Sequence, residues 1–364
     1  MAVTRAKAGI EKIKPHMIAS QTRSVPPPSI LLNSNESVFG PGTHARAAAR
    51  AAISAIERYL EFPDQILAPA IANRFSLDPD RITTGQGSDD LLARLARAYL
   101  GPNTELIRTA NGYLKVPNYA YANDASVISV PDDNFVPSVD NMISALTDQT
   151  RIVYLANPEN PAGTYLNGKE VRRLHAALPD TVLLVIDSAY EEYSDAADYE
   201  PAHRLVEDTA NVVMCRTFSK IFGLAGARVG WLYGPKDVVD AVRRIGLTFP
   251  VTAPSVAATI AAMEDRAHTD FVYQANLKGR VWLASQVAAL GLAVVPSQAN
   301  FILVHFPNPR KSAKAADDYL QTRGIAVRRF ASPAFEEYIR ISIGYEHDLQ
   351  AVRDSIADFL SGEA

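Results

Sequence analysis

Short apolar runs recur along the first 250 residues of the chain, and stretches of helical pattern separate them. The runs are rich in Val, Ile and Leu and carry apolar side chains at consecutive positions. They comprise residues 81–84, 105–108, 126–130, 151–155, 181–186 and 211–215. Strands that are apolar on both faces belong to sheets covered by helices on both sides. The runs therefore predict the strands of a buried, mainly parallel sheet.

The stretches between these runs have the composition of helices. Residues 43–60 are rich in strong helix formers, and Thr43 is a favourable N-cap. Further helices are expected at 88–100, 138–146 and 167–178, the last with Asn and Glu in capping-box spacing at its start. This alternation predicts an α/β fold with right-handed connections. Its ligand site should lie beyond the carboxyl ends of the strands.

The pattern changes near residue 250. Residues 254–290 look largely helical, and the following segments alternate between shorter predicted strands and helices. The strands are 292–295, 300–304, 325–328 and 338–343, and the helices are 311–322 and one that begins near 347. We therefore expect a smaller α+β domain after the large one. The predicted parts are an N-terminal arm that joins the small domain and covers the site (1–42), a large domain (43–250) and a small domain (251–364).

Composition excludes several classes of protein. The 364 residues suffice for roughly two domains, and 48% hydrophobic with 21% charged residues is typical of globular proteins. The net charge of −4, without a basic block, argues against nucleic acid as a partner, and no apolar stretch is long enough to span a membrane. The basic N-terminus lacks the apolar segment of a secretory signal. Cys215 is the only cysteine, in agreement with a cytoplasmic location.

The most informative segment for chemistry is residues 217–231, TFSKIFGLAGARVGW. Lys220 lies in a glycine-rich turn, and Arg228 follows it within the same segment. A lysine that forms a Schiff base needs a fixed loop, a cofactor packed against backbone, and a nearby cation for a phosphate. A single lysine is more often a solvated surface charge. The interpretation therefore depends on partners elsewhere in the chain.

Two polar segments follow predicted strands. In residues 85–90, GQGSDD, the residues Gly87, Ser88 and Asp89 would place free N–H groups at the positive end of a helix, as a phosphate site requires. An ordinary N-cap is the alternative. In residues 157–164, NPENPAGT, the prolines fix the loop so that Asn160 can point into the site. A rigid turn stabilised by its own side chains is the alternative there.

Two further candidates stand at or on predicted strands. Asp187 ends the run TVLLVI, where a buried acid is costly unless it is paired. A protonated pyridine nitrogen would be a suitable partner, and Tyr190 is close enough to reach a ring hydroxyl. Arg340 alternates with isoleucines and shares a strand face with Ser342, so it could bind a substrate carboxylate. The alternatives are a carboxylate that caps the next segment and an arginine that faces solvent.

The ordered set of motifs resembles a known family. G-x-G-S-D-D, N-P-x-N-P-A-G-T, D-x-A-Y, S-K-x-F-G-L-A-G-x-R-x-G and R-I-S-I-G are similar to the fold-type I pyridoxal-phosphate (PLP) aminotransferases of class I/II, most of all to the histidinol-phosphate aminotransferase subgroup. The similarity runs from about Leu32 to about Ala357. It implies a PLP cofactor and ping-pong transfer of an amino group between an amino acid, or an amino-alcohol phosphate such as histidinol phosphate, and a 2-oxo acid. A decarboxylase or racemase of the same fold remains the alternative.

The resemblance also implies roles for individual residues. Lys220 would bind the cofactor covalently and shuttle a proton, and Asp187 would pair with the ring nitrogen. Asn160 and Tyr190 would hydrogen-bond the ring oxygen, and Tyr113 would stack on the ring. The residues that would bind the cofactor phosphate are Gly87, Ser88, Asp89, Ser219 and Arg228. The residues on the substrate side would be Arg340, which binds a carboxylate, Asn35 and Glu36 of the covering arm, and Arg328, a candidate cation for a substrate phosphate.

The chain departs from the family pattern on the substrate side. Glu36 is followed by Ser37 where the family usually has proline, and Ser188 stands where the family commonly has Glu. Residues 58–64 resemble the R-Y-P-D segment, whose tyrosine reaches the cofactor phosphate of the neighbouring subunit in a homodimer. Either Tyr59 or Phe62 would occupy that place. Residues 111–117 are unlike the usual P-T-Y-x-x-Y, and their lysine, residue 115, is expected on the surface.

Overall fold

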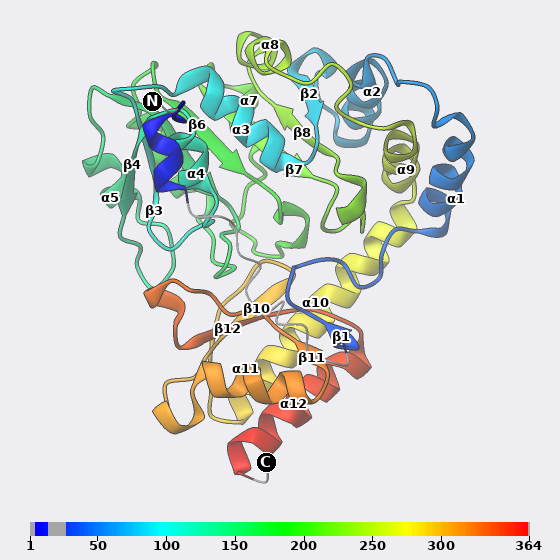
Figure 1. Ribbon diagram of the computed structural model, residues 1–364, viewed down its shortest axis with the longest axis vertical. Coiled ribbons are helices and arrows are strands. Elements are labelled where there is room, and N and C mark those ends of the chain that lie inside the picture. The colour runs from blue at the N-terminus through cyan, green and yellow to red at the C-terminus, as the bar shows by residue number, and fades with distance from the viewer. Residues whose placement is uncertain (1–3, 14–26, 363–364) are drawn as a thin grey trace.

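The computed structural model describes residues 4–13 and 27–362, so residues 14–26 of the predicted arm lie outside the described residues. Figure 1 shows a larger lobe at the top and a smaller one at the bottom, with the long helix α10 (Arg266–Ala289) running from one into the other. The C-terminus lies at the end of the smaller lobe, and the described N-terminal residues lie against the larger lobe.

The larger lobe is built on a seven-stranded sheet in which β8 alone, among its strands, runs antiparallel to its neighbours. In spatial order the strands are β2 (Ile82–Gly85), β8 (Gly230–Tyr233), β7 (Val212–Thr217), β6 (Leu183–Asp187), β5 (Thr150–Ala156), β3 (Glu105–Thr109) and β4 (Ser126–Val130). The predicted mainly parallel sheet is thus confirmed. Strand β8 was not predicted, because its first two residues, Gly230 and Trp231, were taken as the end of the lysine segment.

Both faces of this sheet are buried against helices. Alternate residues of the central strands enter two separate hydrophobic clusters: Leu184 and Ile186 of β6 lie in one, Leu183 and Val185 in the other. The first cluster includes residues of α2 (Pro63–Phe75), α5 (Val139–Ser144), α6 (Gly168–Ala176), α7 (His203–Glu207) and α9 (Ala253–Glu264). The second includes residues of α3 (Ser88–Tyr99), α4 (Val116–Tyr121) and α8 (Lys236–Arg244). Burial on both faces explains why these strands are continuously apolar.

The smaller lobe holds an antiparallel sheet of three strands in the order β12 (Tyr338–Ser342), β10 (Phe301–His305) and β9 (Ala293–Val295). Three helices contribute residues to the core of this lobe: α10, α11 (Ala313–Thr322) and α12 (Glu346–Ser361). Helix α12 packs on both α10 and α11. The arm joins this lobe, because β1 (Ile30–Leu31) pairs with β11 (Ile325–Ala326). Helix α9 packs on α1 (Thr43–Ala52) and α2 of the larger lobe, and the domain boundary expected at residue 250 stays a prediction.

Local signals explain several element boundaries. The prediction of Thr43 as N-cap is wrong by one residue, because Thr43 is the first residue of helix α1 and Gly42 is its N-cap. The helix is also shorter than the predicted 43–60, since a 3₁₀ turn follows Ala52. Asn167 caps α6 as predicted, its side chain accepting from the N–H of Glu170. Helix α2 was not predicted, because it contains Pro69 in addition to the proline at its start. The 3₁₀ helices are Ala8–Lys12, Ile53–Ala55, Pro79–Arg81, Glu191–Tyr193, Ala225–Ala227, Pro309–Lys311 and Pro333–Phe335.

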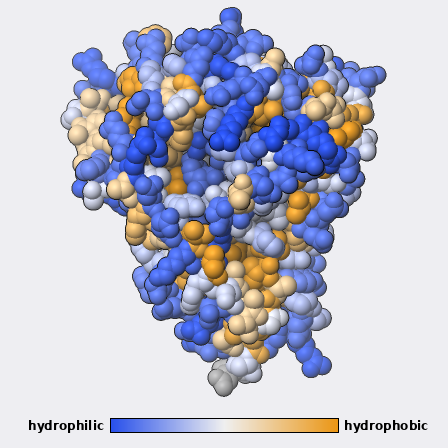
Figure 2. Space-filling view, turned by 180° about the vertical axis from the view of Figure 1, so that it is seen from behind, coloured by the Kyte–Doolittle hydropathy of each residue, from blue (hydrophilic) through white to orange (hydrophobic). Residues whose placement is uncertain are grey.

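Hydrophilic residues predominate on the face seen in Figure 2, and the hydrophobic residues there form separate small patches. Among the helices of residues 4–13 and 27–362, none has the length and apolar character required to cross a membrane.

Candidate active site

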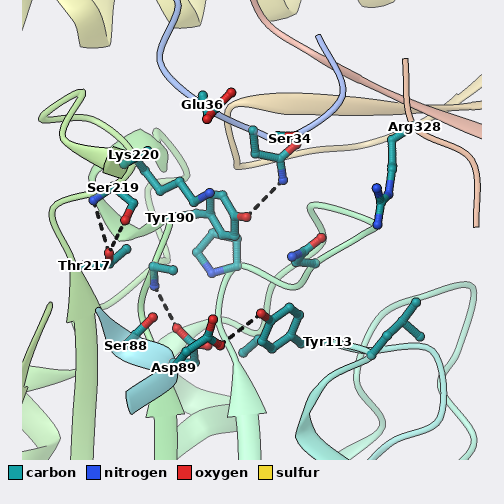
Figure 3. Close-up of a pocket in the computed structure, with 18 of the residues that line it drawn as sticks. Ser34, Glu36, Ser88, Asp89, Tyr113, Tyr190, Thr217, Ser219, Lys220 and Arg328 are labelled. Atoms are coloured by element: carbon teal, nitrogen blue, oxygen red, sulfur yellow. Dashed lines mark hydrogen bonds between the residues drawn. The ribbon is translucent and has the colours of Figure 1, made fainter. Parts of the chain in front are cut away.

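A cavity of about 410 Å³ is lined by residues from the large sheet, the arm and the small domain (Figure 3). Its volume lies within the range of small-molecule and cofactor sites. Most of the residues predicted for the site line it: Asn35, Glu36, Ser88, Asp89, Tyr113, Asn160, Asp187, Tyr190, Ser219, Lys220, Arg228, Arg328 and Arg340. Residues that are far apart in sequence are therefore brought together as the motif order suggested.

Lys220 lies in the loop between β7 and β8, and its amino group is 5.6 Å from the centre of the Tyr190 ring. The loop is held by backbone hydrogen bonds, from Phe218 N–H to the Val229 carbonyl and from Leu224 N–H to the Phe218 carbonyl, each 3.0 Å. A Cβ at Gly223, where φ is +67°, would lie 2.2 Å from the carbonyl carbon of residue 40. Glycine is required there because the arm backbone packs directly on the lysine loop.

The start of α3 and the lysine loop together form a site suited to an anion. Gly87 has φ of +85°, and a Cβ there would lie 2.5 Å from Nη2 of Arg228. Nη1 of Arg228 donates to Ser219 Oγ at 3.2 Å, and Ser88 is the first residue of the helix. A helix start has backbone N–H groups without intrahelical partners and a positive partial charge. With the guanidinium and the serine hydroxyl beside it, this corner can bind a phosphate.

Asp187 ends β6 and is buried. Its Oδ2 accepts from the Tyr154 hydroxyl at 2.8 Å, and its Oδ1 accepts from the N–H of Ala189 at 3.2 Å. Burial raises the pKa of Asp187 to about 6, although the hydrogen bond from Tyr154 acts in the opposite direction. Such a carboxylate would gain from a cationic partner at its open side. Sequence reasoning missed Tyr154, whose signal was a hydroxyl-bearing residue inside the apolar run RIVYLA.

The Asp89 side chain is the acceptor for three donors from one neighbouring segment. It accepts from the hydroxyl of Tyr113 at 3.1 Å and from the hydroxyl of Tyr119, and it pairs with Nζ of Lys115 at 3.2 Å (Figure 3 shows the bond from Tyr113). Burial acts to raise the pKa of Asp89, but these hydrogen bonds and the lysine charge outweigh it and lower the pKa. Lys115 is only one-third exposed, contrary to the surface lysine expected, because it folds back over the Tyr119 ring.

Arg340 of β12 faces the cavity, while the neighbouring isoleucines enter the small-domain core. Its Nη1 donates to Oδ1 of Asn160 at 2.6 Å, and its Nη2 donates to the carbonyl of Asn33 at 3.0 Å. Burial lowers the pKa of Arg340 to about 10, and its Nε has no hydrogen-bond partner among the described residues. The interpretation of Arg340 as a solvent-facing charge is therefore wrong.

Arg328 reaches the same cavity, because its backbone bridges that of Arg340 through two hydrogen bonds of 2.9 Å. Its guanidinium is half-buried, and burial lowers the pKa of Arg328. In Figure 3 it lies across the cavity from Lys220 and Ser219. The cavity thus has two guanidiniums on its small-domain side and one, Arg228, on its large-domain side.

The arm residues differ in exposure. Glu36 is exposed at the cavity, whereas Asn35 is buried and donates from Nδ2 to the Tyr190 hydroxyl at 2.9 Å. Tyr59 does not line this cavity: its side chain is 77% exposed and stacks on Phe249, with ring centres 4.1 Å apart. Phe62, the alternative candidate, is also exposed and outside the cavity. Neither residue serves the site of its own chain.

The chain is similar to known proteins over nearly its whole length. The family described as aminotransferase class I and II matches residues 27–356. Histidinol-phosphate aminotransferase of Rhodopseudomonas palustris is 42% identical over 331 residues, 91% of each chain. Histidinol-phosphate aminotransferase of Paramagnetospirillum magneticum is 40% identical over 361 residues, 99% of each chain.

Solved structures agree with this similarity. The crystal structure of histidinol-phosphate aminotransferase from Sinorhizobium meliloti in complex with pyridoxal-5'-phosphate superposes with a TM-score of 0.90 at 28% identity, covering 100% of this chain and 99% of that one. Aspartate aminotransferase from Thermus thermophilus with maleate shares the fold, with a TM-score of 0.85 at 22% identity over 98% of this chain and 100% of that one. From its sequence and its fold, the chain belongs to the class I and II aminotransferase family.

Proposed function

We propose that this aminotransferase uses PLP to move an amino group between histidinol phosphate and a 2-oxo acid. The observation that carries the proposal is the cavity in which one lysine, one buried acid and three guanidiniums meet. The relatives named above, at 40–42% identity, are histidinol-phosphate aminotransferases, and this supports the choice of substrate. The complex of the Sinorhizobium meliloti relative with pyridoxal-5'-phosphate supports the choice of cofactor.

The residues present fit PLP. The corner between Gly87 and Arg228 has no room for a Cβ, as expected where backbone approaches a phosphate closely. Asp187 is buried with its pKa raised by burial, so a protonated ring nitrogen beside it would relieve an unfavourable state of the carboxylate. Lys220 supplies the amine that PLP enzymes use for covalent attachment.

On this proposal, the bound cofactor supplies an electron sink that stabilises negative charge at the substrate Cα. Asp187 keeps a proton on the ring nitrogen, and Tyr154 holds the Asp187 carboxylate in place. Ser88, Ser219 and Arg228 bind the phosphate. Tyr113 covers one face of the ring, and its orientation is held by its bond to Asp89.

The other residues act on the substrate and on protons. Lys220, once free, removes the proton from the substrate Cα as a general base and returns a proton on the cofactor side. Asn160 and Tyr190 hold the ring oxygen. Arg340 has an unpaired buried Nε and can exchange its present partners for a carboxylate, which a planar guanidinium binds with two parallel hydrogen bonds. Glu36 of the arm covers this side of the cavity. Two half-reactions on one cofactor imply ping-pong kinetics.

The test is the visible absorbance of the purified protein after addition of PLP. We expect a band from the lysine-bound cofactor that is absent in Lys220→Ala, and bleaching of that band when histidinol phosphate is added. Restoration of the band by a 2-oxo acid would complete the transamination cycle. If no lysine-dependent band forms, the cofactor assignment fails. If the band forms but histidinol phosphate leaves it unchanged while another amine bleaches it, only the substrate assignment fails.

Arg328 is the proposed cation for the phosphate of the substrate. Its guanidinium lines the cavity, whereas that of the adjacent Arg329 does not, which provides a matched control. Loss of a charge-assisted contact costs about 1.5–3 kcal/mol, so Arg328→Ala should raise KM for histidinol phosphate roughly ten-fold or more. We expect little change in KM for a phosphate-free amino acid, and little change for either substrate in Arg329→Ala. Equal effects on both substrates would contradict this role.

We also propose a homodimer. Exposed apolar side chains in two segments support it, since exposed apolar patches mark interaction surfaces. One segment carries Ile53, Ile56, Tyr59 and Phe62, and the other carries Leu247 and Phe249, which stacks on Tyr59. In such a dimer Tyr59 would reach the cofactor phosphate of the partner subunit. Light scattering should give twice the mass of the chain, and Ile56→Asp should shift the protein towards monomer. The cytoplasmic location stays a prediction.

A further inference from the structure

The hydrogen bonds around Asn35 have a defined direction. The backbone N–H of Asn35 donates to Oγ of Ser342 at 2.9 Å, so the hydroxyl of Ser342 is free to donate to Oδ1 of Asn35 at 3.1 Å. The amide is thereby oriented with its Nδ2 towards the hydroxyl of Tyr190, to which it donates at 2.9 Å. The carbonyl of Asn35 also accepts from Nδ2 of Asn300 at 3.0 Å. Asn35 is 1% exposed and held on every side.

This direction determines what the Tyr190 hydroxyl can do. A phenol has one proton to donate and lone pairs that accept. The lone pair facing the arm is taken by the Asn35 amide, so the proton must point elsewhere. Among the described residues no acceptor is recorded for it, and Tyr190 lines the cavity next to Lys220. The hydroxyl is therefore set to donate into the cavity.

We propose that Asn35, oriented by Ser342, is a positioning residue that fixes Tyr190 as a hydrogen-bond donor to the ring oxygen of the bound cofactor. This inference rests on the proposed function. It replaces the direct contact with substrate expected for Asn35, because both polar atoms of its side chain are already engaged. A donor at the ring oxygen withdraws negative charge from it and weakens its hold on the proton shared with the lysine nitrogen.

The strand that orients Asn35 also carries Arg340. Positions 340 and 342 lie on the same face of β12. Arg340 donates to Asn160, and Ser342 acts on Tyr190 through Asn35. One strand of the small domain therefore supports both of these contacts, although Asn160 and Tyr190 belong to the large domain.

The experiment is a pH titration of the visible absorbance of the holoenzyme, which needs no turnover. Asn35→Asp keeps the size of the side chain and tolerates the left-handed backbone at this position, where φ is 54°. A carboxylate can only accept, so it turns the Tyr190 proton away from the cavity. We expect the midpoint pH of the colour change to rise by about half a unit or more, in the direction of the rise expected for Tyr190→Phe.

The new charge in Asn35→Asp could itself move the midpoint, so the same substitution is made in Tyr190→Phe. The part of the midpoint shift that acts through the Tyr190 hydroxyl should vanish when Tyr190 is already replaced by Phe. Ser342→Ala removes the orienting hydroxyl without adding a charge, and it should give a smaller rise. Asn211→Ala is the matched control: Asn211 has three hydrogen bonds to residues far from the cavity, and its loss should leave the midpoint unchanged.

An unchanged midpoint in both Asn35→Asp and Ser342→Ala would overturn the proposal, provided that the variants bind the cofactor. The proposal would also be overturned if Asn35→Asp shifted the midpoint equally in the parent protein and in Tyr190→Phe. Absence of any lysine-dependent band in the parent protein would instead refute the proposed function, so the two failures are distinguishable.

Discussion

The two sides of the cavity are built differently. On the large-domain side, Lys220, Asp187 and the start of α3 follow directly from strand ends, and each lies in a short continuous motif. On the small-domain side, Arg340 and Arg328 come from segments that bridge each other, and Asn35 comes from the arm. The first side is held mainly by its own loops, and the second by contacts between separate parts of the chain. Changes on the first side should therefore affect cofactor chemistry directly. On the second side, changes at Arg340 and Arg328 should affect substrate binding, and changes at Asn35 should reach the cofactor only through Tyr190.

The largest effect is expected on the large-domain side, for Asp187→Ala. Removing one partner of a buried charge pair costs about 3–5 kcal/mol, or roughly 10²–10⁴-fold in kcat/KM. The loss should appear in kcat, because the ring nitrogen loses the group that keeps its proton. Steady-state kinetics at saturating cofactor would measure it. A variant that kept kcat and lost only substrate affinity would break the comparison.

On the small-domain side, Arg340→Lys should act on substrate and leave the cofactor in place. Lysine keeps the charge but lacks the planar fork that binds a carboxylate through two hydrogen bonds. We expect KM for the amino acid or 2-oxo acid to rise roughly 30-fold, which corresponds to about 2 kcal/mol of lost binding free energy, while the cofactor band is retained. Loss of the cofactor band would show that the two sides are not separable.

Glu159 is a buried acid next to Asn160, the partner of Arg340. Its carboxylate accepts from the N–H of Asn160 at 3.0 Å and from the hydroxyl of Thr109 at 2.9 Å. Burial raises its pKa to about 7, against the opposing charge of Arg108 and with a small contribution from Asp187. A raised pKa means that the folded protein favours the protonated acid. The stability that this group contributes is therefore full below about pH 4.5 and is lost as the pH rises through 7.

Glu159→Gln should remove this dependence, since glutamine keeps the shape and stays neutral. Because the pKa of Glu159 rises from 4.5 to about 7 on folding, the free energy of unfolding of the parent protein should fall by about 2–3 kcal/mol more than that of the variant between pH 4.5 and 8. Chemical denaturation of the apoprotein at several pH values would measure the difference. Parallel pH profiles for the two proteins would show that Glu159 ionises at no cost.

The smallest effect is expected for Lys115→Met. The pair with Asp89 is one-third exposed on both partners, so solvent screens it and its loss should cost only about 0.5 kcal/mol. We expect cofactor affinity to weaken two- to three-fold, about what this energy corresponds to. Titration of the apoprotein with PLP would measure it, with Lys169→Met on an exposed helix position as the control. A larger loss would mean that Asp89 depends on Lys115 for its place beside the phosphate site.

Local patterns predicted much of the fold. Apolar runs identified β2 to β7, most clearly β5 to β7, because central strands buried on both faces are largely apolar, whereas the edge strand β4 is partly exposed. Strand β8 was not predicted because it is short and adjoins the glycine-rich turn. Helix α2 was not predicted because proline normally argues against a helix interior. The hydrogen bond from Tyr154 to Asp187 was not predicted either, because only the pairing of β5 with β6 brings these two residues together.

The sequence by itself determined the family, the α/β fold and most of the residues that meet in the cavity, because motif order and strand ends constrain where they lie. The tertiary structure alone decided how those residues are connected. It joined Asn35 to the Tyr190 hydroxyl, gave Arg340 the partner Asn160, and placed Lys115 beside Asp89. Hydrogen-bond direction and burial depend on groups that are far apart in the sequence, and no local pattern along the chain records them.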